Sequence, residues 1–592
     1  MRHRLALFPL GLLAMLWCAT VAWAGDGLRV HQLEATQQGD ISSGERLYRQ
    51  HCAGCHHEDR IGRTGPPLLP QFLRRKKPAR LEAIIRHGLP ATLMPAFPQL
   101  TRQDVAALIA FLSRPAGPIT WGLDEIRASR GAVEAEGKDL HVRDIRNITP
   151  VVERGANRVW VVEDERILDK FTFANVHGGI KYTPRGERFF VPARDGWVLQ
   201  YSLRQGRPLN KVRPCVYLRN IALSRDGRRL FATCRLPRQL VVLDSDGLEP
   251  RKLLPLKGRV SAIYALYSDD KALFTYRDRP VLAELDTRDL TIRAYPLDEP
   301  FEDFFIDAFD RYIIGTSRGG KKLAVYDLQD HRKVFEHPIE AMPHLFSATT
   351  WYQDGAFHFA TPHLGKPYIT VWRMYDWAFE RKVDVGGDGF FVKTHPATPW
   401  LWVDNGSDEL VLVAKKDFAI RRLRPMPGKR FNHTEFSGDG RLAYLSIYEP
   451  DGALMVLDAS TLKPIETWPA NVPVGKYNFV NKNRIFYRGL YGLSLFQEKC
   501  WGCHHETAEA FGPPFRQIGR QRSDAEIMAH IADPEGSARR LGYRRNLMPA
   551  FPLNAEQMAS IVEYIKQFGC RPQDGDRWPP RCVPAPHTEE TP

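Results

Sequence analysis

The chain has 592 residues, of which 43% are apolar and 26% charged, an ordinary globular composition that excludes a largely disordered protein. Because this length exceeds what one hydrophobic core supports, we expect about two to four domains. The formal net charge of +14 suits an anionic ligand or an acidic protein partner, and no nucleic-acid partner is predicted.

The first residues have the pattern of an export signal. Basic MRHR precedes the apolar run LALFPLGLLAMLWCATV, and Ala22-Trp23-Ala24 forms a small-x-small cleavage site before Gly25. We therefore predict a cleaved signal peptide at 1–24 and a mature protein in the bacterial periplasm. No later stretch is apolar over the length that a membrane helix needs, so stable membrane insertion is not expected.

A haem-attachment motif follows the predicted signal. HCAGCHH (51–57) contains C-x-x-C-H, in which two thiols bond the haem vinyl groups and the adjacent His56 ligates the iron. GPP, LMPAFP and the helical pattern LTRQDVAALIAFL come next. Met94 of LMPAFP precedes the helix; core packing is the ordinary role of a methionine, but here we expect the sixth iron ligand. The sequence predicts a class I cytochrome c domain at 25–118, attached through Cys52 and Cys55.

The same order of motifs recurs near the other end of the chain. KCWGCHH (499–505) is followed by GPP, by a second LMPAFP and by the helical pattern LNAEQMASIVEYI. A lone C-x-x-C-H can arise by chance or form half of a zinc site, but two copies that are each followed by the same motifs indicate haem. We predict a second class I cytochrome c domain with a tail at 486–592. Its attachment and axial residues are Cys500, Cys503, His504 and Met548. The alternative sixth ligands in the two domains are His57, His87 and His505.

The middle of the chain, after a predicted linker at 119–144, is rich in short β-type runs separated by Gly and Asp turns. One unit recurs, as in SRDGRRLFATCRLPRQLVVLD and SGDGRLAYLSIYEPDGALMVLD: a turn, a short apolar strand, a polar break and a second strand. Eight such units, about 40–45 residues apart, match the spacing of four-stranded propeller blades. A parallel βαβ fold is disfavoured because long helical patterns are missing. We predict an eight-bladed all-β propeller at 145–485, flanked by the two all-α cytochrome domains.

Four histidines lie in loops that join blades or enter strands, positions that often line the top face of a propeller. They are His177, His344, His395 and His433. Each alone is more often a structural histidine, but beside two haem motifs the set suggests a ligated macrocycle.

Four cysteines remain once the haem thiols and Cys18 are set aside. The predicted compartment permits disulfides. Cys570 and Cys582 are a candidate pair in the tail. Cys215 and Cys234 flank a turn-linked strand pair and either bond or remain buried thiols.

The propeller region resembles the haem d1-binding propeller of cytochrome cd1 nitrite reductases and of their relatives in haem d1 biosynthesis. The resemblance runs from about Asn157 to Phe479 and rests on VHGGIKYTPRGERFFVPARDGW, LRNIALSRDGRRLF, FVKTHPATPWLWVD, FNHTEFSGDGRLAYLSIYEPDGALMVLD and VGKYNF. It is closer to the dihydro-haem d1 dehydrogenases, which convert one propionate of dihydro-haem d1 to an acrylate. The resemblance implies a proximal iron ligand, a distal iron ligand, and a histidine and a tyrosine beside the oxidised side chain. The matching residues are His177, His344, His433 and Tyr477.

One departure separates the chain from the nitrite reductases, which carry two distal histidines. His344 matches the second, but the chain reads FEDFFID (301–307) at the first. Nitrite dehydration needs proton delivery at the distal face, so the loss of one donor favours the dehydrogenase. The alternatives are a cd1-type nitrite reductase that forms nitric oxide, a non-catalytic carrier of haem d1 or its precursor, and an electron-transfer propeller without a d1 macrocycle.

The implied reaction removes two protons and two electrons. His433 is expected to act as the base, and Tyr477 to orient the carboxylate or relay a proton. The macrocycle carries several carboxylates, which arginines of the repeat loops are expected to bind. The candidates are Arg194, Arg219, Arg277 and Arg318.

The two haem motifs also predict a route for the electrons. One haem c accepts one electron, so we expect the N-terminal haem to take electrons from the macrocycle. The C-terminal haem, which is additional to the family pattern, would be a built-in acceptor. Expected partners are a periplasmic cytochrome c or cupredoxin as final acceptor, and a cd1 nitrite reductase as recipient of haem d1.

Overall fold

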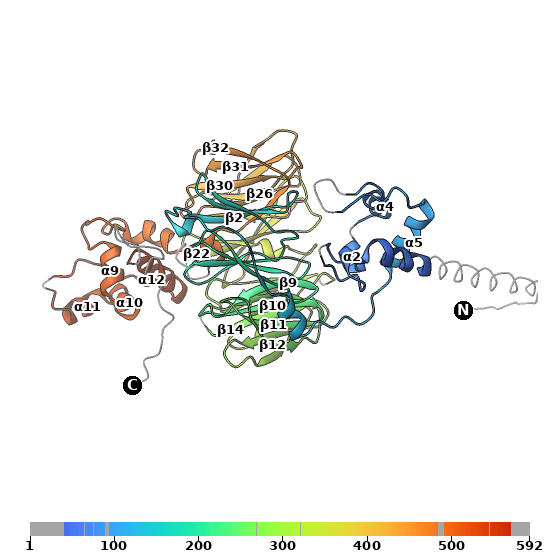
Figure 1. Ribbon diagram of the computed structural model, residues 1–592. Helices are drawn as coiled ribbons and strands as arrows, with labels where there is room; N and C mark the ends of the chain where they lie inside the picture. The colour runs from blue at the N-terminus through green and yellow to red at the C-terminus, as the bar shows by residue number, and fades with distance from the viewer. Residues whose placement is uncertain are drawn as a thin grey trace, which may run out of the picture. The chain divides into compact units, whose positions relative to one another are not determined.

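A computed structural model describes residues 41–63, 65–74, 76–88, 94–267, 269–319, 321–483, 491–543 and 545–569. The chain divides after Ile119 into two compact units, and Figure 1 shows their elements. The predicted signal peptide at 1–24 and the candidate pair Cys570 and Cys582 lie outside the described residues. None of the described helices is both long and apolar enough to cross a membrane.

The first unit is helical, as predicted. Residues 41–51 are helical, and the elements that follow are α2 (Ala53–His56), α3 (Pro70–Leu73), α4 (Pro78–His87) and α5 (Arg102–Ser113). Helix α5 begins at a capping box: Thr101 Oγ1 accepts the Asp104 N–H (3.1 Å), and Asp104 Oδ2 accepts the Thr101 N–H (2.9 Å). Its apolar face packs against Tyr48 and Leu73, and this core holds the haem-attachment segment.

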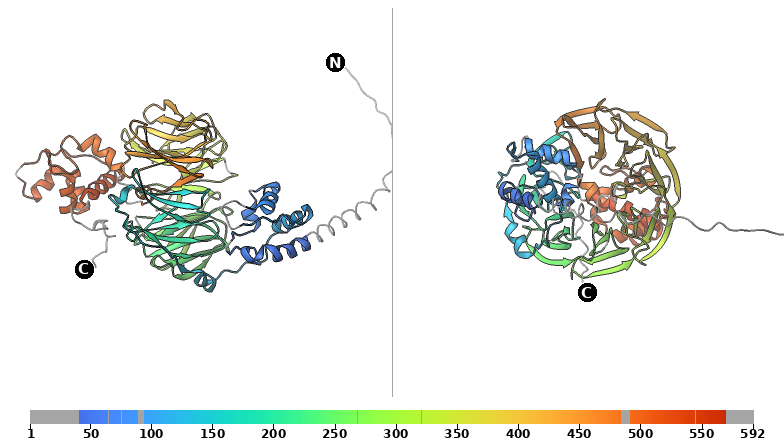
Figure 2. Two further views of the ribbon diagram at one scale, coloured as in Figure 1. Left: turned by 45° about the horizontal axis from the view of Figure 1, so that its top comes forward. Right: turned by 90° about the vertical axis from the view of Figure 1, so that its right-hand side faces the viewer.

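The second unit contains eight antiparallel sheets, which form a ring seen end-on in Figure 2. Within each sheet the first strand is innermost and the last is at the exposed rim. The first four blades are β33 (Pro473–Lys476), β2 (Ile148–Glu153), β3 (Arg158–Glu163), β4 (Arg166–Thr172); β5 (Lys181–Tyr182), β6 (Arg188–Pro192), β7 (Val198–Ser202), β8 (Arg207–Val212); β9 (Tyr217–Leu223), β10 (Arg229–Leu236), β11 (Gln239–Asp244), β12 (Pro250–Pro255); and β13 (Val260–Ala265), β14 (Lys271–Tyr276), β15 (Val281–Asp286), β16 (Ile292–Pro296). The other four are β17 (Asp303–Ile306), β18 (Tyr312–Thr316), β19 (Lys322–Asp327), β20 (Arg332–Pro338); β21 (Thr349–Gln353), β22 (Ala356–Pro362), β23 (Tyr368–Arg373), β24 (Phe379–Asp384); β25 (Val392–Lys393), β26 (Trp400–Asp404), β27 (Leu410–Ala414), β28 (Ile420–Leu423); and β29 (Phe431–Phe436), β30 (Leu442–Ile447), β31 (Gly452–Asp458), β32 (Pro464–Ala470).

The burial of the strands explains their sequences. Strands in the middle of a blade, such as QLVVLD of β11, are nearly continuous apolar runs because neighbouring blades cover both faces, whereas rim strand β28 (IRRL) is largely exposed. The ring closes where β33, from the end of the propeller segment, pairs with β2 in the register Val151↔Lys476. Closure leaves no free inner edge, which is how propellers protect their sheets. The predicted eight-bladed propeller is confirmed.

Most of the predicted linker 119–144 is folded onto the propeller. Helix α6 (Leu123–Ser129) buries Ile126 in the core of the β9–β12 blade. Strand β1 (Gly131–Ala132) adds a fifth strand to the β5–β8 blade, because Gly131 pairs with Lys211 of β8. Nearby, Cys215 and Cys234 form a disulfide, which decides between the two alternatives left open by the sequence.

Each blade has two ends. We call the end where loops 173–180, 339–348, 385–391 and 424–430 enter the first strands the entry end. We call the end where turns 307–311, 354–355, 394–399 and 437–441 join first to second strands the return end. Strands of about six residues span about 20 Å, so the two ends are about that far apart.

The C-terminal cytochrome packs on the return end. It consists of a helical turn at 491–495, a π-helical turn η3 (Phe496–Cys500), α9 (Phe515–Gln521), α10 (Asp524–Ala532), α11 (Pro534–Arg540) and α12 (Ala555–Gly569). The Tyr491 ring lies 6.1 Å from Phe309 and 5.2 Å from Phe357, and Gln557 Nε2 donates to Tyr352 Oη (3.0 Å). A shared apolar core joins the two domains. Short helix α7 (Phe479–Lys482) precedes this domain and packs Phe479 and Val480 against Ile145 and Ile148 of the propeller.

Candidate haem and macrocycle sites

Both C-x-x-C-H histidines are held in the same way. His56 Nδ1–H donates to the Pro66 carbonyl (2.7 Å), and His504 Nδ1–H donates to the Pro513 carbonyl (2.8 Å). A haem-ligating histidine usually donates its second ring N–H to a backbone carbonyl, which fixes the tautomer and leaves Nε2 for the iron. The two proline carbonyls belong to the two GPP motifs, which explains why these motifs recur.

The glycine of each GPP motif makes room for the imidazole. A Cβ at Gly65 would lie 2.6 Å from His56 Cε1, and a Cβ at Gly512 would lie 2.5 Å from His504 Cε1. All four haem thiols are unbonded, and Cys55 and Cys503 are exposed. The described residues therefore fit covalent haem c at both motifs.

The predicted axial methionines lie in comparable loops. Met548 and Cys500 line one apolar cavity, and reciprocal bonds with the Asn546 side chain hold the Met548 backbone. Met94 is half-buried and lies in the loop before α5. A thioether and an attachment thiol on one apolar cavity fit a haem edge between them.

The alternative sixth ligands are placed differently. His57 Nδ1 accepts the Asp59 N–H (3.2 Å), and His505 Nδ1 accepts the Thr507 N–H (3.1 Å). His87 is exposed near the end of α4.

His177 lies at the entry end, just before β5. Its N–H donates to the Pro192 carbonyl (2.9 Å), and the next residue, Gly178, has φ +99°, where a Cβ would lie 2.7 Å from the Arg219 carbonyl oxygen. Burial, followed by the charges of Arg194 and Arg219, lowers the pKa of His177 well below its usual value. The imidazole is therefore neutral, which is the form that ligates metals, and its buried Nδ1 bonds to no described residue.

His344 lies in the loop that enters β21. Its Nδ1–H donates to the Phe390 carbonyl (2.8 Å), and its Nε2 lies 4.0 Å from Oδ2 of Asp303. Asp303 belongs to the FEDFFID stretch, which has no histidine at the position expected for the first distal histidine. Burial raises the pKa of Asp303 to about 8, so an uncharged carboxyl faces His344 near neutral pH.

His433 and Tyr477 come from adjacent inner strands. His433 has φ +57° at a bulge in β29, and its N–H donates to Asp404 Oδ2 (3.1 Å). Burial, with the charge of Lys476 next, lowers the pKa of His433 well below its usual value. Tyr477 directly follows β33, and burial raises its pKa to about 12. A left-handed conformation is uncommon for residues other than glycine.

Shared neighbours show that the four predicted residues lie near one another at the entry end. The charge of Arg219 acts on both His177 and His344. The Phe391 ring lies 5.9 Å from His344 and 4.6 Å from His433. A Cβ at Gly179, two residues after His177, would lie 3.6 Å from Cε1 of the Tyr477 ring.

The four predicted arginines divide into two pairs. Arg194 and Arg219 lie close enough to His177 for their charges to act on it. Arg277 and Arg318 both form ion pairs with Glu302, at 2.8 and 3.0 Å, and the Arg318 side chain is 68% exposed.

Two further arginines whose charges act on His177 were not predicted from the sequence: Arg235 and Arg154. Both lie beside turns between strands, where nothing in the local sequence distinguishes them from surface arginines.

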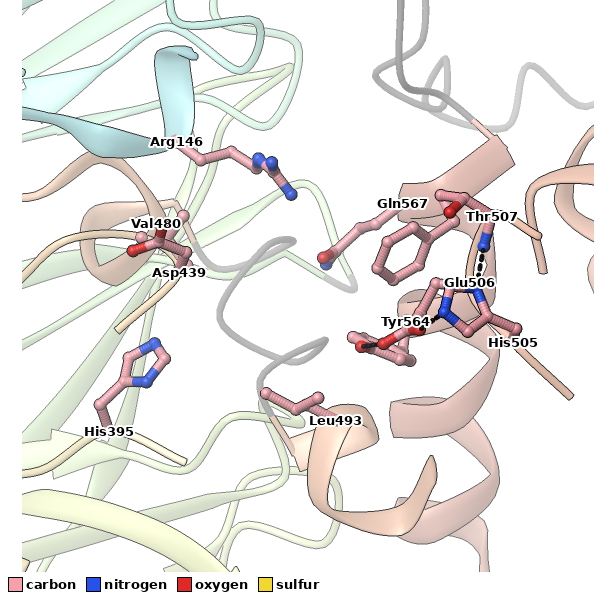
Figure 3. Close-up of a pocket in the computed structure, with 12 residues that line it drawn as sticks. Arg146, His395, Asp439, Val480, Leu493, His505, Glu506, Thr507, Tyr564 and Gln567 are labelled. Atoms are coloured by element: carbon pink, nitrogen blue, oxygen red, sulfur yellow. Dashed lines mark hydrogen bonds and ion pairs between the residues drawn. The ribbon is translucent and has the colours of Figure 1, made fainter. Parts of the chain in front are cut away.

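The prediction that His395 shares one face of the propeller with the other three histidines was wrong. His395 lies at the return end, where its Nδ1 accepts the Ala397 N–H (3.1 Å), because the short strand β25 ends before it. There it lines a cavity of about 360 Å³ between the propeller and the C-terminal cytochrome (Figure 3). Across the cavity, Tyr564 Oη donates to Glu506 (3.2 Å).

The fold and these sites define a haem-binding propeller that is preceded and followed in the sequence by a cytochrome c domain. The model of the "Cytochrome D1 heme domain" matches residues 143–482. The models of "Cytochrome C oxidase, cbb3-type, subunit III" and of "Cytochrome c" match residues 39–112 and 490–569.

Similar proteins agree with these matches. The chain is 35% identical to a "Dihydro-heme d1 dehydrogenase" of Pseudomonas aeruginosa over 473 residues, 76% of this chain and 96% of that protein. It is 20% identical to a "Nitrite reductase" of Stutzerimonas stutzeri over 541 residues, 77% of this chain and 96% of the relative. A solved structure, "Dihydro-heme d1 dehydrogenase NirN in complex with DHE", superposes with a TM-score of 0.71 at 34% identity, covering 75% of this chain and 99% of that one. The chain belongs to the cytochrome d1 haem-domain family, in the branch that contains the dihydro-haem d1 dehydrogenase.

Proposed function

We propose that the chain is an oxidoreductase of haem d1 biosynthesis, which oxidises one propionate of dihydro-haem d1 to an acrylate at the entry end of the propeller. The ring of His177, His344, His433 and Tyr477 supports this function most directly, since it occurs in a chain 35% identical to a dihydro-haem d1 dehydrogenase. Neutral His177 and His344 would ligate the iron of the macrocycle from its two faces. Arg194 and Arg219 would bind its carboxylates.

The reaction breaks two C–H bonds of the propionate, forms one C=C bond, and releases two protons and two electrons. His433 accepts a proton, because its imidazole is neutral and its buried Nδ1 bonds to no described residue. Tyr477, whose raised pKa keeps the phenol protonated, donates a hydrogen bond to the carboxylate or relays a proton.

The two haem c groups would each accept one electron. Cys52, Cys55, Cys500 and Cys503 would attach them, with His56, Met94, His504 and Met548 as axial ligands. We further propose that the signal at 1–24 directs the chain to the periplasm. There a cytochrome c or cupredoxin would reoxidise the haems, and a cd1 nitrite reductase would receive the product.

The C-terminal haem would be a built-in second acceptor. About a quarter of the chain lies outside the match to the dehydrogenase, since 76% is covered. Replacing Cys500 and Cys503 with alanine removes this haem without exposing the apolar interface that a deletion from about residue 490 would uncover. We expect the variant to store one electron fewer per molecule in the first turnover. An unchanged electron count would contradict this role.

Nitrite reduction is the second candidate, because Asp303 places a protonated carboxyl beside His344, near where nitrite reductases use histidine. Incubation with dihydro-haem d1, then mass analysis of the extracted macrocycle, distinguishes the functions. The dehydrogenase yields a product lighter by two hydrogens. Unchanged mass with nitric oxide formation from nitrite indicates the reductase, and tight binding without either reaction indicates a carrier.

A further inference from the structure

A cluster of lysines lies near His433 and Tyr477 toward the centre of the ring of blades, which we call the channel. Lys393 belongs to β25, Lys476 to β33 and Lys482 to α7. The charges of all three act on the His433 imidazole. Three ammonium groups from three different elements meet where the reacting side chain of the macrocycle would lie.

Two of these lysines have protein partners. Lys476 is buried and donates to the His433 carbonyl (2.7 Å) and the Val474 carbonyl (3.3 Å), and also to the Ser446 hydroxyl. These three acceptors use all three N–H groups of an ammonium. Lys393 Nζ lies 3.4 Å from Oε1 of Glu435.

Glu435 is the main counter-charge on this side of the channel, and it is already engaged. It is 1% exposed, and the Asn481 amide donates to the same Oε1 (2.7 Å). Asp404 is also near, but it accepts the N–H groups of Phe390, Phe391 and His433. The cluster therefore carries more positive than negative charge.

Lys482 is the lysine of this cluster without a direct anionic partner among the described residues, although the charge of Glu435 acts on it from a distance. Its half-buried ammonium lies 5.6 Å from the centre of the Tyr477 ring and makes no hydrogen bond or ion pair with any described residue. Burial, followed by the charge of Lys393, lowers its pKa to about 7. A half-buried ammonium without an anion is costly, and a bound carboxylate would offset that cost.

We propose that Lys482, with Lys393 beside it, binds the carboxylate of the propionate that is oxidised. This inference rests on the proposed function and assigns a positioning residue to it. The ion pair turns the side chain toward His433 and Tyr477. It also stabilises the negative charge that spreads onto the carboxylate when the adjacent C–H proton leaves to His433. Lys482 exchanges no atom in the reaction. Two protons leave the substrate, and the two electrons that the substrate loses go to the two ferric c-type haems.

The carboxylate bound by Lys482 is distinct from the other carboxylates of the macrocycle. Arg194 and Arg219 lie near His177, on the side of the iron ligand, whereas Lys482 faces Tyr477. Loss of Lys482 therefore weakens the hold on one carboxylate only.

The test is an anaerobic optical titration of the oxidised two-haem protein with dihydro-haem d1 and with its fully esterified form. For Lys482→Met we expect the dissociation constant for the free acid to rise about 10- to 100-fold, the worth of one charge-assisted hydrogen bond. The constant for the ester should stay within about twofold of the unmodified protein, and Lys482→Arg should recover most of the affinity. Exposed Lys463→Met is the matched control.

The outcomes separate this inference from the proposed function. Equal binding of the free acid by Lys482→Met and the unmodified protein overturns the lysine role while oxidation continues. An unmodified protein that neither binds nor oxidises dihydro-haem d1 overturns the function itself. If Lys482→Met does not fold, Lys482→Gln against Lys482→Arg makes the same comparison.

Discussion

Protonation of His363 should destabilise the propeller in acid. His363 is 1% exposed, its Nδ1–H donates to the Ala341 carbonyl (2.8 Å), and its Nε2 accepts from Thr370 Oγ1 (2.9 Å). The same hydroxyl already accepts the Trp372 indole N–H (2.9 Å), so its proton points to the imidazole. Burial lowers the pKa of His363 to about 4.

The sign follows from the protons bound in each state. Between the unfolded value of 6.5 and about 4, the unfolded chain binds a proton on this imidazole that the folded protein excludes. Stability is therefore fully present above pH 6.5 and is lost as the pH falls toward 4. At about 1.4 kcal/mol per pKa unit, the loss from this group is at most about 3.5 kcal/mol.

The assay is urea unfolding of the haem-loaded protein followed by tryptophan fluorescence, at about pH 7 and about pH 4.5. His363→Gln lowers stability at both pH values because it disturbs the hydrogen bonds, but its loss between the two should be about 2–3 kcal/mol smaller than that of the unmodified protein. His141→Gln, at a side chain 79% exposed, is the control. A His363→Gln variant that loses as much stability on acidification as the unmodified protein would refute the reasoning.

Three further predictions concern the site and the domain contacts. Tyr477→Phe should lower kcat for dihydro-haem d1 oxidation about 10²- to 10⁴-fold with little change in macrocycle binding. The rate of haem c reduction in a stopped-flow experiment measures this effect, and an unchanged rate would exclude a role of Tyr477 in proton transfer. Tyr491→Ala removes a buried ring from the interface between the propeller and the C-terminal cytochrome and should cost about 3–5 kcal/mol, detected as faster proteolysis between these domains; equal resistance would contradict docking through this ring. Reducing the Cys215–Cys234 disulfide, whose cysteines are 19 residues apart, should lower the free energy of unfolding by about 3 kcal/mol, and the double serine variant should show no response to reductant.

The repeats in the sequence were sufficient to predict the domain plan. Both GPP motifs could be recognised as parts of haem domains, but only the structure shows that Pro66 and Pro513 accept the His56 and His504 ring N–H groups. Blade number was predictable because each blade repeats one apolar pattern that neighbouring blades must cover.

The side chains that face the channel were harder to predict. His395 was predicted on the wrong face because β25 has only two residues. A residue that follows so short a strand already lies at the return end. Nothing in the sequence marked Lys482 as a site residue, since its position beside Tyr477 depends on the closure of the propeller by β33. Arg277 and Arg318 could not be separated from Arg219 without knowing that Glu302 lies beside them.

The most direct measurement of the central claim is an anaerobic single turnover. The oxidised protein is mixed with dihydro-haem d1, haem c reduction is followed in the visible spectrum, and the extracted macrocycle is weighed. We predict two haem c irons reduced for each macrocycle that becomes lighter by two hydrogens. A spectral binding shift with no haem c reduction and no change in mass would contradict the account.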